Sequence, residues 1–183
     1  RYPRKLKLLY PDFLNSQGIN MSSIEEIYNE RYRGSYRKRL EGFELARWNA
    51  LEHFLPWVTA NYDINRILDY GAGRGAFTPL WKNLFPTAEL YVSDISSVAL
   101  DKLTTDFPEY KHSTVLIEKD KAMMEDESVD LVISIEVLEH VQHLCAYVSD
   151  IYRLLAPGGL FVWTTPCANR LSIEHIYGLI TGK

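Results

Sequence analysis

The chain has 183 residues, of which 46% are hydrophobic and 24% are charged, and its net charge is −4. This is the composition of one globular domain with a core of its own, and it excludes a disordered or disulfide-scaffold protein. The longest apolar runs, such as residues 131–135, are too short to cross a bilayer, so no membrane span is expected. Two unpatterned cysteines, Cys145 and Cys167, and no secretory signal favour a reducing, cytoplasmic location.

Charge is distributed unevenly along the chain. Residues 1–47 carry ten basic and six acidic side chains, whereas the remainder carries ten basic and eighteen acidic ones. A basic segment can attract an anionic partner, but a solvated helix surface explains these charges more simply. The acidic total argues against nucleic acid as a partner.

The predicted elements run from an N-terminal arm to a core of strands and helices. Residues 1–20 carry scattered Pro and Asn and predict an arm, and helical spacing of apolar residues follows over 23–33 and 36–58. Residues 121–128 are predicted as a loop. Strands are predicted over 66–71, 89–94, 114–120, 129–135 and 159–166, and further helices over 76–85, 97–106 and 136–155.

This alternation predicts the fold class. Parallel strands need long crossover connections, which helices provide, and the sequence carries no tight hairpin signal between its strands. We therefore predict an α/β fold with a doubly wound, mostly parallel sheet covered by helices on both faces. In such sheets ligands bind beyond the carboxyl ends of the strands.

The first predicted strand ends in the glycine-rich loop LDYGAGRGAF, residues 68–77. Glycines at a strand-to-helix turn allow a tight bend and the close approach of a ligand to backbone amides. Asp94 ends the second predicted strand, where a carboxylate can accept hydrogen bonds from ribose hydroxyls. The loop fits NAD or an adenosyl cofactor, but Asp69 would repel a pyrophosphate and could receive an amino group. Asp120 ends the third predicted strand, where an adenine could be recognised.

Four motifs extend this pattern: ILDYGAGRGAF, VSDIS, SVDLVISIEVLEHV and RLLAPGGLFVWTTP, in this order. Together they resemble the class I S-adenosylmethionine-dependent methyltransferases, in particular the small-molecule type that includes quinone-biosynthesis and sugar methyltransferases. The resemblance implies a Rossmann-like methyltransferase fold in which N-terminal helices form a lid over the cofactor. It divides the chain into an arm at 1–20, a helical lid segment at 21–60 and a cofactor-binding core at 61–183.

The C-terminus departs from the family pattern. The family's sheet ends in an antiparallel strand pair, whereas residues 169–183 predict a helix, so the strand pair is missing from the sequence pattern. Because the chain also begins with Arg1 rather than Met, we expect it to be a truncated piece of a longer protein.

The resemblance implies roles for single residues. Asp94 would bind the ribose, Asp120 the adenine amine, and Tyr32, Arg33 and Arg37 are candidates for the cofactor carboxylate. The residues implied to bind S-adenosylmethionine are Asp69, Gly71, Ala72, Gly73, Gly75, Asp94, Ile95, Asp120, Lys121, Ala122, Ile135 and Glu136.

The segment ISIEVLEHVQHL, residues 133–144, places four polar side chains on one face of the predicted helix. These are Glu136, Glu139, His140 and His143. Methyl transfer to a hydroxyl benefits from a base near neutral pH, so His140 is predicted as the general base and Glu139 as its catalytic neighbour. A structural role for the Glu-His pair remains an open alternative.

A metal site is the other alternative for this segment. The Glu-x-x-Glu-His pattern resembles that of small-RNA terminal 2′-O-methyltransferases, which use a divalent ion to hold the acceptor oxygens. Carboxylate and imidazole ligands suit Mg, Mn or Zn. Metal-free relatives carry the same motif, so a divalent metal is possible but not favoured.

The leading hypothesis is methyl transfer from S-adenosylmethionine to a small-molecule or sugar-like acceptor, at oxygen. The alternatives are a divalent-metal-dependent RNA terminal 2′-O-methyltransferase, a non-catalytic cofactor-binding subunit and a nicotinamide dehydrogenase. The sequence indicates neither the acceptor nor the oligomeric state.

Overall fold

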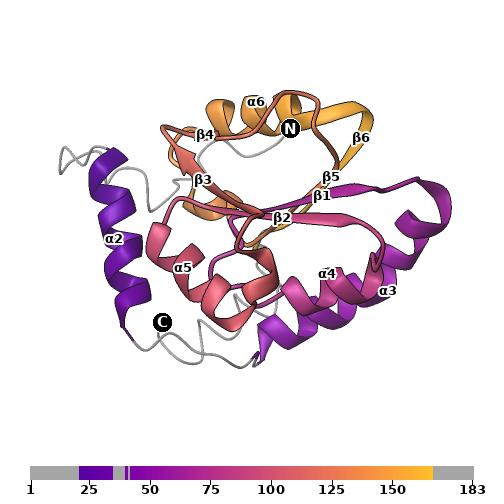
Figure 1. Cartoon of the computed structure of the whole chain (residues 1–183), viewed down its shortest axis with the longest axis horizontal. Helices are drawn as coiled ribbons and strands as arrows, with labels where there is room; N and C mark the ends of the chain where they lie inside the picture. The colour runs from indigo at the N-terminus through magenta and orange to yellow at the C-terminus, as the bar shows by residue number, and fades with distance from the viewer. Residues whose placement is uncertain (1–20, 35–39, 41, 167–183) are drawn as a thin grey trace, which may run out of the picture.

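The computed structural model of the chain describes residues 21–34, 40 and 42–166, with a six-stranded sheet at the centre (Figure 1). All neighbouring strands are parallel except β3 and β4, which confirms the predicted doubly wound, mostly parallel sheet. The strands are β1 Arg66–Tyr70, β2 Glu89–Asp94, β3 Thr114–Glu118, β4 Lys121–Ala122, β5 Val129–Ile135 and β6 Leu155–Thr164, in the order β4-β3-β2-β1-β5-β6.

Helices cover both faces of this sheet. Figure 1 shows α6 on one face and α3, α4 and α5 on the other, with α2 beside α5 at the sheet's margin. Their bounds are α2 Met21–Arg33, α3 Phe43–Asn61, α4 Thr78–Leu84, α5 Ser97–Asp106 and α6 Leu144–Leu154, with short 3₁₀ turns η1 Pro108–Tyr110 and η2 Leu138–His140.

The strand order reverses beside β1. The chain goes from β1 to β2 on one side and later to β5 on the other, so Asp69 pairs with Val92 of β2 and with Ile133 of β5. The loop after β1 leads to α4 on one face of the sheet and the segment after β5 leads to α6 on the other, so the two separate at the carboxyl ends of these strands. A ligand crevice is expected at this point of a doubly wound fold.

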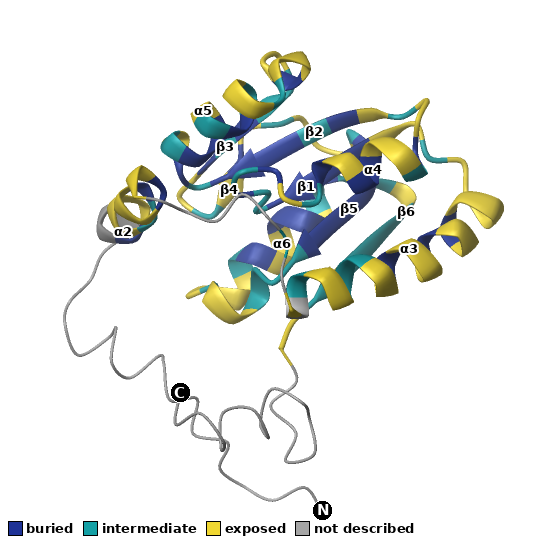
Figure 2. Cartoon of the chain, turned by 90° about the horizontal axis from the view of Figure 1, so that it is seen from below, coloured by how far each residue is buried: buried dark blue, intermediate teal, exposed yellow. Residues whose placement is uncertain are grey.

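Two apolar clusters form the core, one on each face. Alternate side chains of a strand point to opposite faces, so Ile67 packs in one cluster and Leu68 in the other. Figure 2 shows the buried residues gathered on the sheet and on the inner faces of the helices. Leu131 is fully buried in the first cluster, and truncation of such a side chain to Ala costs about 2–5 kcal/mol.

The helix predicted over 36–58 is displaced toward the C-terminus. In the structure α3 begins at Phe43, after Gly42 with φ 54°, and continues to Asn61, through Pro56. Leu51 and Leu55 on α3 pack into the first core cluster, as their helical spacing predicts, whereas Phe54 is exposed. The division between a lid at 21–60 and a core at 61–183 stays a prediction.

The single helix predicted over 136–155 is wrong. Glu136 has φ 57°, a left-handed conformation that ends β5 and cannot continue into an α-helix. A 3₁₀ turn follows, and α6 begins only at Leu144. The four polar residues therefore do not share one helix face.

The third strand and the loop after it also differ from the prediction. β3 ends at Glu118, and Lys119 and Asp120, with φ 50° and 62°, form a tight turn into β4. β4 is antiparallel to β3 and has only two residues, Lys121 and Ala122. The helix predicted over 169–183 lies outside the described residues.

Candidate active site

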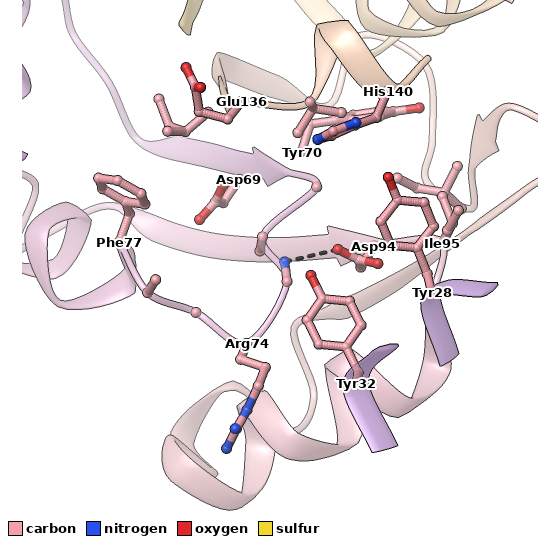
Figure 3. A pocket seen from close by; sticks show the side chains of 18 of the residues that line it. Tyr28, Tyr32, Asp69, Tyr70, Arg74, Phe77, Asp94, Ile95, Glu136 and His140 are labelled. Carbon is pink, nitrogen blue, oxygen red and sulfur yellow. Dashed lines mark hydrogen bonds between the residues drawn. The ribbon is translucent and has the colours of Figure 1, made fainter. Parts of the chain in front are cut away.

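A cavity of about 600 Å³ lies at the carboxyl ends of β1, β2 and β5, at the reversal of strand order. This volume is within the range of small-molecule and cofactor sites. Its walls come from the loops after these strands and from the inner face of α2, which contributes Tyr28 and Tyr32 (Figure 3).

The structure brings twelve of the fourteen predicted site residues to this cavity. The two that do not line it are Lys121, which is exposed, and Ala122, which is buried beneath the sheet's edge. The Ala122 amide donates to Asp150 Oδ2 at 2.8 Å, so it is engaged by the core. The twelve lining residues are Asp69, Gly71, Ala72, Gly73, Gly75, Asp94, Ile95, Asp120, Ile135, Glu136, Glu139 and His140.

The glycine loop is tightly enclosed. Gly71 has φ 82°, and a Cβ atom there would lie 2.4 Å from Val137 Cγ2. Gly73 has φ 56°, and a Cβ atom there would lie 2.7 Å from the Tyr32 hydroxyl. Both the conformation and the contacts therefore require glycine at these two positions of the cavity wall.

Asp69 is a buried carboxyl group at the cavity floor. Its Oδ2 accepts a hydrogen bond from Trp81 Nε1 at 2.7 Å. Desolvation raises the pKa of Asp69 to about 7, the negative charge of Asp94 adds to this, and the Trp81 bond opposes it.

Asp94 is a second buried carboxyl group beside the loop. It accepts hydrogen bonds at 2.9 Å from the Gly73 amide, drawn in Figure 3, and from the Ser96 amide. Desolvation raises the pKa of Asp94 to about 6, although these backbone bonds favour the charged form. Two buried carboxyls with raised pKa in one cavity are typical of a functional site.

The four polar residues that were predicted to share one helix face, between Glu136 and His143, contact different groups in the structure. Glu136 forms a 2.6 Å ion pair with Arg47 of α3 and accepts a hydrogen bond from the Thr164 hydroxyl at 2.9 Å. Desolvation raises the pKa of Glu136, and these two partners oppose that rise. His143, outside the cavity lining, lies 2.8 Å from Asp120 through its Nδ1.

His140 and Glu139 lie at the exposed rim of the cavity. The His140 ring meets Tyr28 edge-on, with 6.3 Å between ring centroids. Partial desolvation lowers the pKa of His140, Arg31 lowers it further, and Glu136 opposes the change. Glu139 accepts a hydrogen bond from the Thr165 hydroxyl at 3.3 Å.

Metal ligation was the alternative for these residues. Within residues 21–34, 40 and 42–166, no group of three or more His, Cys, Asp or Glu side chains is arranged to hold a metal ion.

The wall formed by α2 was only partly predicted. Tyr32 lines the cavity, but Arg33 pairs with Glu26 at 2.7 Å and with Glu30 on the exposed side of the helix. Arg37 lies outside the described residues. The spacing of Ile24, Tyr28 and Tyr32 every four residues is the sequence signal for this wall, and all three line the cavity.

Arg74 is another lining residue that the sequence did not single out. It stands inside the glycine loop and forms a 3.0 Å ion pair with Asp106 of α5, so its guanidinium is held beside the cavity.

None of the helices in the described part of the chain is both long enough and apolar enough to span a bilayer.

The chain is similar in sequence to known proteins. The family described as "Methyltransferase domain" matches residues 28–179. Malonyl-[acyl-carrier protein] O-methyltransferase of Methylococcus capsulatus is 35% identical over 101 residues, which cover 55% of this chain and 37% of that protein. Ubiquinone biosynthesis O-methyltransferase of Rickettsia canadensis is 28% identical over 140 residues, which cover 73% of this chain and 56% of the relative.

The fold is also similar to a solved structure. The PH0226 protein of Pyrococcus horikoshii has a TM-score of 0.62 and 23% identity, with coverage of 86% of this chain and 69% of that chain. The chain spans less than two thirds of the length of the two curated relatives above.

Proposed function

The chain belongs to the methyltransferase-domain family, and we propose that it is an S-adenosylmethionine-dependent enzyme that methylates a small-molecule or sugar-like acceptor at oxygen. One observation carries the proposal: the glycine loop and two buried carboxyls, Asp69 and Asp94, line one cavity at the reversal of strand order. Family membership supports the reaction, and the cavity supports its location.

The residues present fit S-adenosylmethionine. Its polar groups are an amino acid and a ribose, which need carboxylate acceptors, a cation and open backbone. The cavity offers Asp69 and Asp94 as acceptors, Arg74 as a cation, and the backbone carbonyls of Gly71 and Gly73, whose amides already donate to the Ser93 carbonyl and to Asp94. The cavity also has an apolar lining, which suits a flat adenine and includes Ile95, next to Asp94, together with Ile117, Val137 and Val141.

This chain's residues would divide the work of binding. Asp94 already accepts two backbone amides and has lone pairs left for ribose hydroxyls. Asp69, held by Trp81, would accept the amino group of the cofactor. Asp120, held by His143, would accept the adenine amine. When bound, S-adenosylmethionine supplies an electrophilic methyl group and its own leaving group.

The rim residues would serve the acceptor. His140 is held by Tyr28 and has a lowered pKa, so the ring stays neutral at pH 7 and can take the proton of an acceptor hydroxyl. Glu136 favours the protonated ring and would stabilise it, and Glu139, one residue before His140 at the same rim, would contact the acceptor. The main contribution of the protein is alignment of the acceptor with the methyl group.

The relatives favour oxygen as the acceptor atom, because both curated relatives described above are named as O-methyltransferases. The name of the second relative, which refers to ubiquinone biosynthesis, supports a small-molecule acceptor. A cytoplasmic location remains part of the proposal and rests on the sequence alone.

Nicotinamide dehydrogenase activity is disfavoured by charge. Asp69 directly precedes the glycine loop, where a dinucleotide would place its pyrophosphate, and the ionised carboxylate would repel it. Asp94 does not discriminate, because it could accept ribose hydroxyls of either cofactor. The RNA methyltransferase and the non-catalytic subunit are not favoured by any contact of the described residues.

Calorimetric titration tests the proposal. We expect S-adenosylhomocysteine to bind one site per chain and NAD not to bind. Asp94→Asn, which keeps the shape but removes the charge, should weaken S-adenosylhomocysteine about 10-fold or more, since a charge-assisted bond contributes about 1.5–3 kcal/mol. Asp126→Asn, at an exposed carboxylate far from the cavity lining, is the matched control. NAD binding, or equal affinity in both variants, would contradict the proposal.

The acceptor is identified separately. Purified protein and S-adenosylmethionine with a ¹³C-labelled methyl group are incubated with pools of phenols, catechols, sugars and carboxylic acids. The chemical shift of the transferred carbon distinguishes a methoxy group from a methyl on carbon or nitrogen. Product label on carbon would overturn oxygen as the acceptor atom and leave the cofactor assignment intact.

A further inference from the structure

One polar side chain stands in the middle of the inner face of α2. Ile24, Tyr28 and Tyr32 cover this face with apolar and aromatic surface, whereas Asn29 is 5% exposed and polar. Asn is a weak helix former, and a buried amide is costly unless it is hydrogen-bonded. The buried amide of Asn29 therefore needs a hydrogen-bond partner.

That partner is Ser96, which is fully buried in the turn between β2 and α5. The Ser96 hydroxyl donates to Asn29 Oδ1 at 2.6 Å and accepts from the Ala99 amide at 3.1 Å as the N-cap of α5. The Ser96 backbone amide donates to Asp94 Oδ1 at 2.9 Å. One residue thus connects α2, the start of α5 and the carboxylate assigned to the ribose.

A second contact fixes the same end of α2 to α5. Lys102 of α5 donates from its Nζ to the backbone carbonyl of Tyr32. The Tyr32 hydroxyl in turn lies against Gly73, whose amide donates to Asp94 Oδ2 at 2.9 Å. In Figure 3 both Tyr28 and Tyr32 point from α2 toward the cavity, beside Ile95 and Asp94.

We propose that Asn29 is a positioning residue of the cofactor site: through Ser96 it docks α2 onto the turn that carries Asp94, so that Tyr28 and Tyr32 close the cavity. The inference rests on the proposed function, since it takes the cavity to be the cofactor site. Docking of α2 and binding of the cofactor then stabilise each other, because each contacts the same turn.

Affinity measurements with S-adenosylhomocysteine test the coupling. Asn29→Ala removes the acceptor of the Ser96 hydroxyl proton, while the hydroxyl still caps α5, and we expect binding to weaken about 10-fold. Glu25→Ala, on the exposed side of the same helix, should bind as wild type does.

A double-mutant cycle separates the hydrogen bond from a general loss of packing. In a Ser96→Ala background, where the partner is absent, Asn29→Ala should weaken binding by less than about 2-fold further. Equal effects of Asn29→Ala in both backgrounds would show that the Asn29–Ser96 bond carries no coupling and would overturn the inference.

Hydrogen exchange shows where the effect acts. In wild-type protein, S-adenosylhomocysteine should slow exchange of the amides of α2, and Asn29→Ala should lose this added protection while the amides of β5 remain protected. Asn29→Ala that binds within 2-fold of wild type, or α2 amides that do not respond to the ligand, would overturn the inference alone. Failure of the wild-type protein to bind would overturn the proposed function with it.

Discussion

The two ends of the cavity are built differently. The side proposed to bind the cofactor, which we call the cofactor side, contains Asp69, the glycine loop and Asp94; it follows buried parallel strands, and each of these carboxyls is fixed by a hydrogen bond at 2.7–2.9 Å. The side proposed to bind the acceptor, which we call the acceptor side, carries Glu139 and His140; it follows a single strand and passes through the left-handed Glu136 and a 3₁₀ turn to an exposed rim.

Under the proposed function, the difference would follow from what each side binds. Burial at the strand ends would hold the groups that bind the cofactor rigid. The acceptor would be bound by loop residues that a fixed scaffold holds in place. Substitutions on the cofactor side should therefore alter binding, and those on the acceptor side should alter turnover.

The largest expected effect lies on the acceptor side. His140→Gln removes the proposed base and should lower kcat by about 100-fold or more, while S-adenosylhomocysteine binding stays within 2-fold of wild type. In the wild type, because the pKa of His140 is lowered, kcat should fall only below pH 6.5, as the ring becomes protonated.

Steady-state kinetics with the identified acceptor measures both quantities. His112→Gln, at an exposed residue outside the cavity, should leave them unchanged. A His140→Gln enzyme with wild-type kcat would leave the rim residue with a structural role only.

The next effect lies on the cofactor side. Gly71→Ala places a Cβ 2.4 Å from Val137 Cγ2 and should weaken S-adenosylhomocysteine about 10–100-fold, since crowding of this kind costs about 1–3 kcal/mol. Gly158→Ala has the same φ of 82°, but nothing lies within 4 Å of its Cβ, so it is a matched control for backbone strain. Comparable affinity losses in the two variants would show that the effect of Gly71→Ala does not come from the contacts of Gly71 at the cavity.

The buried carboxyls of the cofactor side should also make both stability and cofactor affinity depend on pH. The folded-state pKa of Asp69 is about 7, above its usual 3.8, so the folded protein binds the extra proton more tightly. This contribution to stability is present below about pH 4 and is lost as pH rises to 7. Cofactor affinity should change in the opposite direction, because binding needs the carboxylates of Asp69 and Asp94 in their charged form.

Thermal unfolding with and without S-adenosylhomocysteine measures this. The Tm of the free protein should fall by about 5 °C between pH 5 and pH 7.5, and the shift produced by the ligand should grow over the same interval. In Asp69→Asn the fall should be smaller. A ligand-induced shift that shrinks as pH rises would contradict the assigned roles.

The smallest expected effect concerns the ion pair that joins α3 to the residue after β5. Arg47→Met leaves the Glu136 carboxylate without its ion-pair partner, and the free energy of unfolding should fall by about 1–3 kcal/mol. Lys82→Met breaks an exposed, solvent-screened pair with Glu109 and should lower the free energy of unfolding by clearly less than Arg47→Met does. Chemical denaturation that gave equal losses would show that the Glu136 pair contributes no more than a surface contact.

The same contrast explains what the sequence could predict. Buried parallel strands are continuous apolar runs, and glycines that need positive φ are conspicuous, so the five parallel strands, the loop and the position of Asp94 were predicted from local pattern, whereas the two-residue β4 was not. The polar residues from Glu136 to His143 have helical spacing, and no glycine or proline marks the interruption of the predicted helix. The left-handed turn at Glu136 was therefore not predicted.

Tertiary contacts explain the remaining differences. Ala122 was expected beside the adenine, but Asp150 of α6, 28 residues away, engages its amide. Asn29 and Ser96 are 67 residues apart, and no local pattern indicates that they meet. Such pairs become visible only when the fold places their elements side by side.

A crystal structure of the chain with S-adenosylhomocysteine would show whether the cavity is the cofactor site. We expect the ribose hydroxyls within hydrogen-bond distance of Asp94, the amino group at Asp69, and the sulfur facing the rim that carries His140. A ligand bound outside the cavity, or bound in it with the ribose remote from Asp94, would show that these roles are wrong.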